Sequence, residues 1–128
     1  MNPSIEQHFD AIEARLIQSP MVVSYHVVRR EVAQSDGKLR VQTTLSDGGA
    51  LELFEYVVWA EAHVRLVRYS FHRQDADRNL RQRWDNAPHY PTLPYAPHHV
   101  HTRDGGVDGI AEAPDVFAVI GRIEDVLW

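Results

Sequence analysis

The sequence predicts an α+β fold: an antiparallel meander sheet of about five strands, with an N-terminal and a C-terminal helix packed on one face. Two observations carry this prediction. Apolar residues recur at helical spacing near the two ends of the chain, and β-branched and aromatic runs separated by short turns lie between them. A chain of 128 residues can bury about two-thirds of its unfolded surface, so we expect a single domain over residues 1–128.

Both predicted helices begin at residues that favour helix starts. In residues 1–20, Asn2 can cap the first turn, Pro3 suits the first helical position and Pro20 ends the helix. The apolar stripe of this helix consists of Ile5, Phe9, Ile12, Leu16 and Ile17. In residues 114–128, Pro114 opens the helix, and its stripe consists of Val116, Ile120, Ile123 and Leu127.

Residues 21–86 are predicted to form the sheet. Five β-branched and aromatic runs are separated by turn signals such as Ser35-Asp36-Gly37-Lys38 and Ser46-Asp47-Gly48-Gly49. The runs are 21–31, 39–45, 51–59, 63–74 and 80–86. Loops this short join antiparallel strands, because a parallel pair needs a crossover of about a dozen residues or more.

Residues 87–113 carry no usable period, and we expect a long functional loop there. Pro88, Pro91, Pro94 and Pro97 recur at every third residue, which is the turn length of a polyproline II helix. Such a helix would be either a rigid connector or a docking segment for the aromatic groove of a partner protein.

The composition excludes several classes of protein. The chain has no cysteine, which excludes disulfide scaffolds, Cys-type zinc sites and thiol catalysis. Residues 1–10 lack the basic start of a signal peptide, and no apolar run is long enough to span a membrane. We therefore expect a cytoplasmic protein with no membrane partner.

The charge is unevenly distributed along the chain. Thirteen Lys and Arg stand against 18 Asp and Glu, a formal net charge of −5 that on its own argues against nucleic acid as a partner. Residues 65–103, however, hold seven arginines, three aspartates and five of the eight histidines. RNA therefore stays open as a ligand of this basic, histidine-rich middle.

Strand alternation within residues 63–74 and 80–86 gathers cationic and titratable side chains on one face of the sheet. If Gln74 pairs with Asn79, the pairs on that face are His72 with Arg81, Ser70 with Arg83, and Arg68 with Asp85. On the opposite face the same register pairs Tyr69 with Trp84 in the core.

These residue types suit phosphate chemistry. Guanidinium donates two parallel hydrogen bonds to phosphate, and the chain has twelve arginines and one lysine. Metal-free cleavage of RNA needs a base for the 2′-hydroxyl, an acid for the leaving oxygen and fixed cations, roles that histidine and arginine fill near neutral pH. Tyr90, Tyr95 and Trp84 offer rings on which unpaired bases can stack.

Other interpretations of these residues stay open. Arg68 with Asp85 could be only a cross-strand ion pair, and His72 could be a hydrogen-bonded structural residue. His89, His99 and His101 could hold zinc through three imidazoles, although no His-Glu-x-x-His motif accompanies them.

Three strings of residues resemble the signature of TumE-type toxins. They are Tyr69-Ser70-Phe71-His72-x-Gln74-Asp75-Ala76-Asp77, Arg83-Trp84-Asp85-Asn86-Ala87-Pro88-His89 and Pro97-His98-His99-x-His101. These toxins belong to prokaryotic type II toxin–antitoxin modules and are usually encoded beside a helix-turn-helix antitoxin. The resemblance therefore implies a toxin whose partner is such an antitoxin. The chain departs from the family pattern at Arg78-Asn79, where glycine is frequent, and at Val100, where a basic residue is frequent.

Together these arguments predict a toxin that acts as a metal-independent ribonuclease. We assign His72 and one of His98, His99 or His101 to proton transfer, with Asp85 orienting a base or an arginine. The residues expected to bind substrate are Arg68, Tyr69, Arg81, Arg83, Trp84, Asn86 and His89. Two alternatives remain: a non-catalytic toxin that docks a protein target through the Pro/His loop, and a binding domain with no toxin role.

Overall fold

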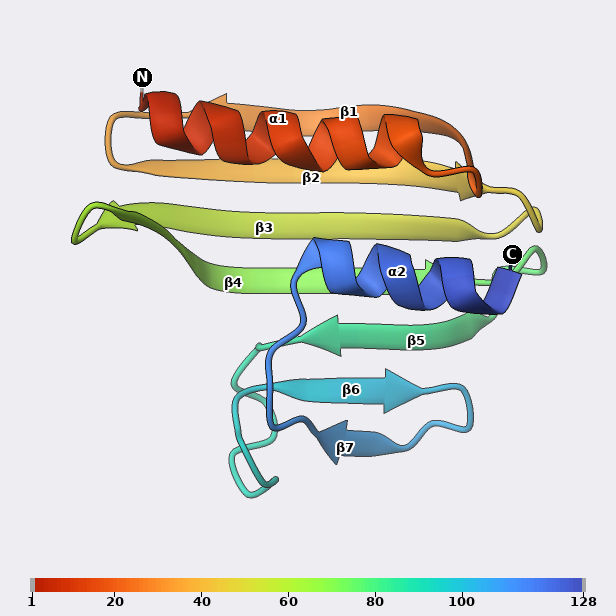
Figure 1. Cartoon of the computed structure of the whole chain (residues 1–128). Coiled ribbons are helices and arrows are strands. Elements are labelled where there is room, and N and C mark those ends of the chain that lie inside the picture. Colours follow the sequence, from red (N-terminus) through yellow and green to blue (C-terminus); the bar gives the residue numbers. More distant parts are fainter. Residues whose placement is uncertain (1, 128) are drawn as a thin grey trace.

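The computed structural model of the chain, which describes residues 2–127, shows a seven-stranded antiparallel sheet with both helices on one face (Figure 1). The elements are α1 (Pro3–Gln18), β1 (Val22–Val32), β2 (Asp36–Leu45), β3 (Ala50–Ala60), β4 (His63–Gln74), β5 (Leu80–Asp85), β6 (His99–Thr102), β7 (Val107–Gly109) and α2 (Val116–Leu127). Each strand pairs with its neighbour in sequence, so the sheet order is β1-β2-β3-β4-β5-β6-β7. The predicted antiparallel meander and its two helices are confirmed.

The sheet has seven strands where about five were expected. The five predicted runs correspond to β1–β5, but β6 and β7 form a hairpin inside residues 87–113, where an irregular loop was expected. These strands are four and three residues long. Strands this short carry too few alternations for a period to be recognised in the sequence.

The proline spacing does not produce a polyproline II helix, because residues 88–97 fold into successive turns. Backbone N–H groups of Leu93, Ala96 and His98 each donate to the carbonyl three residues earlier, which curls the chain back on itself. Gly109 on β7 lets this part of the chain pack closely, since a Cβ atom there would lie 1.9 Å from the carbonyl oxygen of Pro94. We call residues 86–98 the turn segment.

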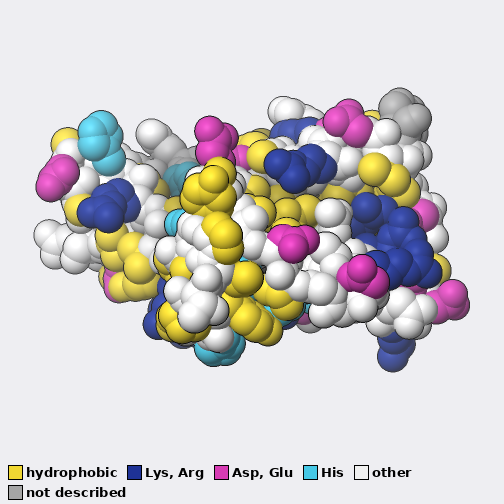
Figure 2. Space-filling model, turned by 90° about the horizontal axis from the view of Figure 1, so that it is seen from below, with side chains coloured by type: hydrophobic (Ala, Val, Ile, Leu, Met, Phe, Trp, Pro, Cys, Tyr) yellow, Lys and Arg dark blue, Asp and Glu magenta, His cyan; other side chains and the backbone are white. Residues whose placement is uncertain are grey.

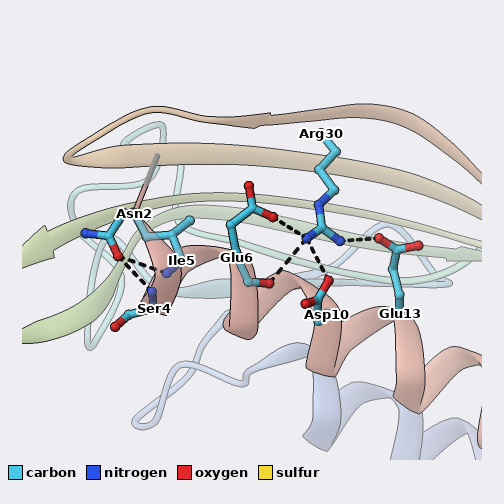
Figure 3. Close-up of polar contacts among 7 residues, drawn as sticks. All are labelled: Asn2, Ser4, Ile5, Glu6, Asp10, Glu13 and Arg30. Carbon is cyan, nitrogen blue, oxygen red and sulfur yellow. Dashed lines mark hydrogen bonds and ion pairs between the residues drawn. The ribbon is translucent and has the colours of Figure 1, made fainter.

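Helix α1 starts as the sequence indicates and is clamped to β1 by one arginine. The side chain of Asn2 accepts hydrogen bonds from the backbone N–H groups of Ser4 and Ile5 (Figure 3). Arg30 on β1 binds three carboxylates that recur along the helix, those of Glu6, Asp10 and Glu13 (Figure 3). Because Arg30 faces the helix, its charge is not available on the opposite face of the sheet.

The apolar stripes differ from the predicted ones at their ends. Ile17 of α1 is 70% exposed, because the four buried residues Ile5, Phe9, Ile12 and Leu16 already form the stripe that faces the sheet. Helix α2 begins at Val116 instead of Pro114, since the side chain of Asp115 accepts from the N–H of Ala118 and caps the first turn.

The core lies between the two helices and one face of the sheet. It contains the buried apolar residues Leu39, Val41, Leu45, Leu51, Leu53, Val57, Tyr69, Phe71 and Trp84 of the strands. We call the other face of the sheet, which carries the alternate residues of β2–β6, the open face. Both helices lie on the far side of it (Figure 1). Within residues 2–127 no helix is both long and apolar enough to cross a membrane.

One carboxylate is buried in this core. Glu55 on β3 is 1% exposed, and its Oε1 lies 2.7 Å from Nε2 of His8 on α1. A buried carboxylate that loses its partner is costly, so this contact ties α1 to the centre of the sheet.

We predict that His8→Ala lowers the free energy of unfolding by about 3 kcal/mol, because Glu55 is left buried without its partner. Urea denaturation of the purified protein measures the change. Gln7→Ala, which removes an exposed side chain from the same turn of α1, is the matched control. Equal stability of the two variants would show that the His8–Glu55 contact does not hold α1 in place.

Candidate functional site

A buried carboxylate lies on the open face at the end of β5. Asp85 is 5% exposed. Its Oδ1 accepts from the backbone N–H of Ala87 at 3.0 Å and lies 2.9 Å from Nε2 of His99. Its Oδ2 accepts from Nε of Arg83 at 3.1 Å and lies 3.6 Å from Nε2 of His101. A single carboxylate therefore joins β5, β6 and the start of the turn segment.

His99 is positioned so that both ring nitrogens face oxygen acceptors. Its Nδ1 lies 2.8 Å from the carbonyl oxygen of Pro97, and its Nε2 faces Asp85. Both nitrogens of this buried ring therefore lie against oxygen atoms of the protein, so His99 supports Asp85 and does not face a substrate.

Two histidines flank one arginine across three strands of the open face. His72 on β4 pairs with Arg83 on β5, and Arg83 pairs with His101 on β6. Cβ atoms of directly opposed residues lie about 5 Å apart, which places the two histidines about 10 Å apart with the arginine between them. We call these three residues the His–Arg–His row.

The guanidinium of Arg83 keeps its outer end available. Its Nε donates to Asp85, while no described residue in the range 2–127 accepts from its two terminal nitrogens. The side chain is 43% exposed. Seen from the side of β7, histidine and basic side chains reach the surface close to one another at the lower margin of the view (Figure 2). Arg83 can therefore bind an anion without giving up its contact with Asp85.

Both histidines of the row have a lowered pKa. For His72 burial is the main cause, Arg83 adds to it and Glu52 opposes it. For His101 burial again lowers the pKa most, and Asp85 opposes it. Both rings are therefore neutral near pH 7 and able to accept a proton. Within the described part of the chain, the buried Nδ1 of His72 has no hydrogen-bond partner, so proton exchange with a substrate falls to Nε2.

A hollow on the open face adjoins the row. It has a volume of about 240 Å³ and is lined by Arg40, Glu52, Ser70, His72, Gln74 and Arg83. A larger hollow of about 500 Å³ extends from it toward β1 and shares Glu52, His72 and Gln74 with it. The two hollows therefore adjoin at these three residues.

The predicted register between β4 and β5 is wrong by two residues. The strands pair Ser70 with Asp85 and Phe71 with Trp84, because a register shift next to Gln74 makes that residue pair with Leu80 and not with Asn79. A shift by two keeps every side chain on its own face. His72, Arg83 and Asp85 therefore still share one face, as expected.

The same shift changes the partners of two predicted phosphate ligands. Arg81 falls at the register shift and has no paired residue on β4 among those described. Arg68 pairs with Tyr56 on β3 and lies beyond the end of β5, so it does not meet Asp85.

Three residues assigned to the site lie on the helix side of the sheet. Trp84 and Tyr69 are 2% and 3% exposed and belong to the core. The hydroxyl of Tyr69 lies 2.9 Å from Nδ1 of His98, and their rings stack; burial raises the pKa of this hydroxyl. Because β6 alternates, His98 lies on the opposite side from His99 and His101, and it takes no part in the row.

The remaining assigned residues lie in or beside the turn segment. The side chain of Asn86 accepts from the N–H of Tyr69 and donates to the carbonyl of Val67, so it extends the pairing of β4 with β5. His89 is exposed and lies outside the cluster around Asp85. Tyr90, considered in the sequence for base stacking, instead packs edge-on against the rings of His99 and His101. No spacing in the sequence signals that contact.

Asp85, His99 and His101 form the one trio in the described chain whose ligand atoms lie close enough to hold a metal ion, within 4.8 Å of one another. The zinc interpretation of the sequence had His89 in place of Asp85. The contact of His99 Nδ1 with the carbonyl of Pro97 leaves Nε2 of His99 as the nitrogen that such an ion would take.

We predict that Arg83→Met raises the pKa of both His72 and His101, because removal of the neighbouring positive charge favours each imidazolium. Titration of the histidine ring resonances by NMR measures both values. Arg68→Met, which removes an arginine outside the row, is the control and should leave both unchanged. If Arg83→Met leaves both titrations where they are, Arg83 does not lie between the two rings.

Comparison with known proteins gives one match. The sequence model of a family described as "Toxin TumE" matches residues 12–127. No curated protein and no solved structure matches the chain. The matched range contains the whole sheet and every residue of the site.

Proposed function

The chain belongs to the TumE toxin family, and from this premise we propose that it is the toxin of a toxin–antitoxin pair and cleaves RNA without a metal ion. The family supports the toxin role and, with it, an antitoxin partner. The observation that supports cleavage is the His–Arg–His row, which sets two histidines on either side of a guanidinium with a free outer end.

The proposed reaction is an internal transfer at the RNA phosphate. The phosphate binds the terminal nitrogens of Arg83. His72 takes the proton of the 2′-hydroxyl through Nε2, the 2′-oxygen forms a bond to phosphorus, and the bond from phosphorus to the 5′-oxygen breaks. His101, which takes up a proton from water when the anionic phosphate binds beside it, gives that proton to the 5′-oxygen. The products are a 2′,3′-cyclic phosphate and a free 5′-hydroxyl, and proton exchange with water restores both rings.

The surroundings of the two histidines support this division of roles. Burial and Arg83 keep His72 neutral, as a base must be. Burial lowers the pKa of His101 and the carboxylate of Asp85 opposes that shift, so the negative charge of a bound phosphate is needed to protonate this ring before it acts as the acid. Asp85 is a positioning residue, since its Oδ2 contacts both Nε of Arg83 and Nε2 of His101.

The contacts of Asp85 support a reaction without metal. Its two oxygens already meet a backbone N–H, a guanidinium nitrogen and two imidazole nitrogens. Arg83 already supplies a positive charge at this carboxylate, so the proposed cleavage is expected to persist in EDTA.

We predict that His72→Ala and His101→Ala each slow RNA cleavage by about 100-fold or more, because each removes one proton-transfer group. The measurement follows a labelled RNA with purified protein in EDTA and identifies the cyclic phosphate product. His63→Ala, at an exposed position where β4 starts, is the control. Thermal unfolding confirms that the variants stay folded.

Three outcomes would overturn parts of this proposal. Cleavage by His72→Ala at the wild-type rate removes His72 from the reaction. Cleavage abolished by EDTA points to a metal ion at Asp85, His99 and His101. Growth arrest on expression of a protein that never cleaves RNA favours the non-catalytic toxin, which would dock its target through the exposed turn segment.

A further inference from the structure

A second group of side chains on the open face lies beside the His–Arg–His row. Phe54 and Tyr56 are alternate residues of β3 and share one face. Arg40 pairs with Phe54 and Lys38 with Tyr56 from β2, and Arg68 pairs with Tyr56 from β4. We call these five residues the aromatic–cation stripe. None of them was assigned to stacking from the sequence.

Each ring of the stripe is partly exposed and carries a cation over its face. The guanidinium carbon of Arg40 lies 4.6 Å from the centre of the Phe54 ring, and Nζ of Lys38 lies 5.6 Å from the centre of the Tyr56 ring. The hydroxyl of Tyr56 donates to Asp36 at 2.9 Å, which fixes that ring. Both helices lie on the other side of the sheet (Figure 1), so no helix covers the rings.

The stripe continues directly from the proposed site of cleavage. Phe54 is opposite Ser70, and Ser70 is opposite Asp85. Along β3, Phe54 follows Glu52, which lines the hollow beside Arg83, by two residues, or about 7 Å. A polymeric ligand bound at Arg83 that extends along β3 therefore meets Phe54 first and Tyr56 next.

We propose that the aromatic–cation stripe binds single-stranded RNA on one side of the cleaved phosphate, with Phe54 and Tyr56 stacking on successive bases. This rests on the proposed function, because it takes RNA as the substrate. Every base has a face that stacks on an aromatic ring, and Arg and Lys meet the phosphates between bases. When a base covers a ring, Lys38 moves from Tyr56 to the adjacent phosphate, and Arg40, which is ion-paired with Glu52 at 2.6 Å, exchanges that carboxylate for a phosphate.

The chemistry of the stripe selects unpaired strands. In a double helix the bases stack on one another and offer no face to Phe54 or Tyr56. Two rings and three cations form a repeating surface without a buried pocket for a base edge. The stripe is therefore expected to accept most sequences and to strengthen binding with the length of the strand.

Binding can be measured without cleavage by fluorescence anisotropy with a labelled single-stranded DNA decamer, which lacks the 2′-hydroxyl. Phe54→Ala and Tyr56→Ala should each weaken binding about tenfold, because each removes one stacking partner. Phe54→Leu, which keeps an apolar side chain, should weaken it equally. Val67→Ala, at an exposed apolar position on β4, is the control. An abasic decamer should bind wild type and Phe54→Leu with equal affinity.

Cleavage provides a second readout. Phe54→Leu should raise the KM of a ten-nucleotide RNA about tenfold and leave its kcat unchanged, while cleavage of a dinucleotide stays at the wild-type rate. Wild-type affinity of Phe54→Leu and Tyr56→Ala for the DNA decamer would overturn the stripe even where cleavage is confirmed. If Phe54→Leu and Tyr56→Ala lose decamer binding but the wild-type protein never cleaves RNA, the stripe is a nucleic-acid surface and the proposed function is overturned.

Discussion

The buried carboxylate of Asp85 is the constraint on which the open face depends. It contacts Arg83 on its own strand, His99 and His101 on β6, and the backbone of Ala87 where the chain leaves β5. An isolated buried charge is costly, so these partners must lie close around it. The hairpin of β6 and β7 places His99 and His101 beside Asp85. Its pairing with β5 sets His101 opposite Arg83 and so completes the His–Arg–His row.

The turn segment completes this arrangement. The carbonyl of Pro97 holds Nδ1 of His99, so that Nε2 faces Asp85. Tyr90 packs against His99 and His101 and closes the cluster from the other side. Gly109 allows the segment to approach β7 at Pro94. The proline-rich turn segment therefore holds His99 and His101 in place. None of these contacts involves the terminal nitrogens of Arg83.

Strand alternation and capping account for what could be predicted from the sequence. Asn2 caps α1 as expected, and His72, Arg83 and Asp85 share a face because an even shift of register preserves alternation. The register itself depends on the irregular pairing of Gln74 with Leu80, which no residue type signals. His98 and His99 are adjacent in sequence yet lie on opposite faces, and only the phase of β6, a four-residue strand, separates them. Alternation with Arg83 and Asp85 already places Trp84 on the core face, so its assignment to substrate binding conflicted with the pattern of its own strand.

A crystal structure of the protein with an uncleavable 2′-deoxy dinucleotide tests the central claim most directly. The account predicts that the phosphate lies about 3 Å from the terminal nitrogens of Arg83, with His72 on one side and His101 on the other. A phosphate bound away from Arg83, or a metal ion seated between Asp85, His99 and His101, would contradict it.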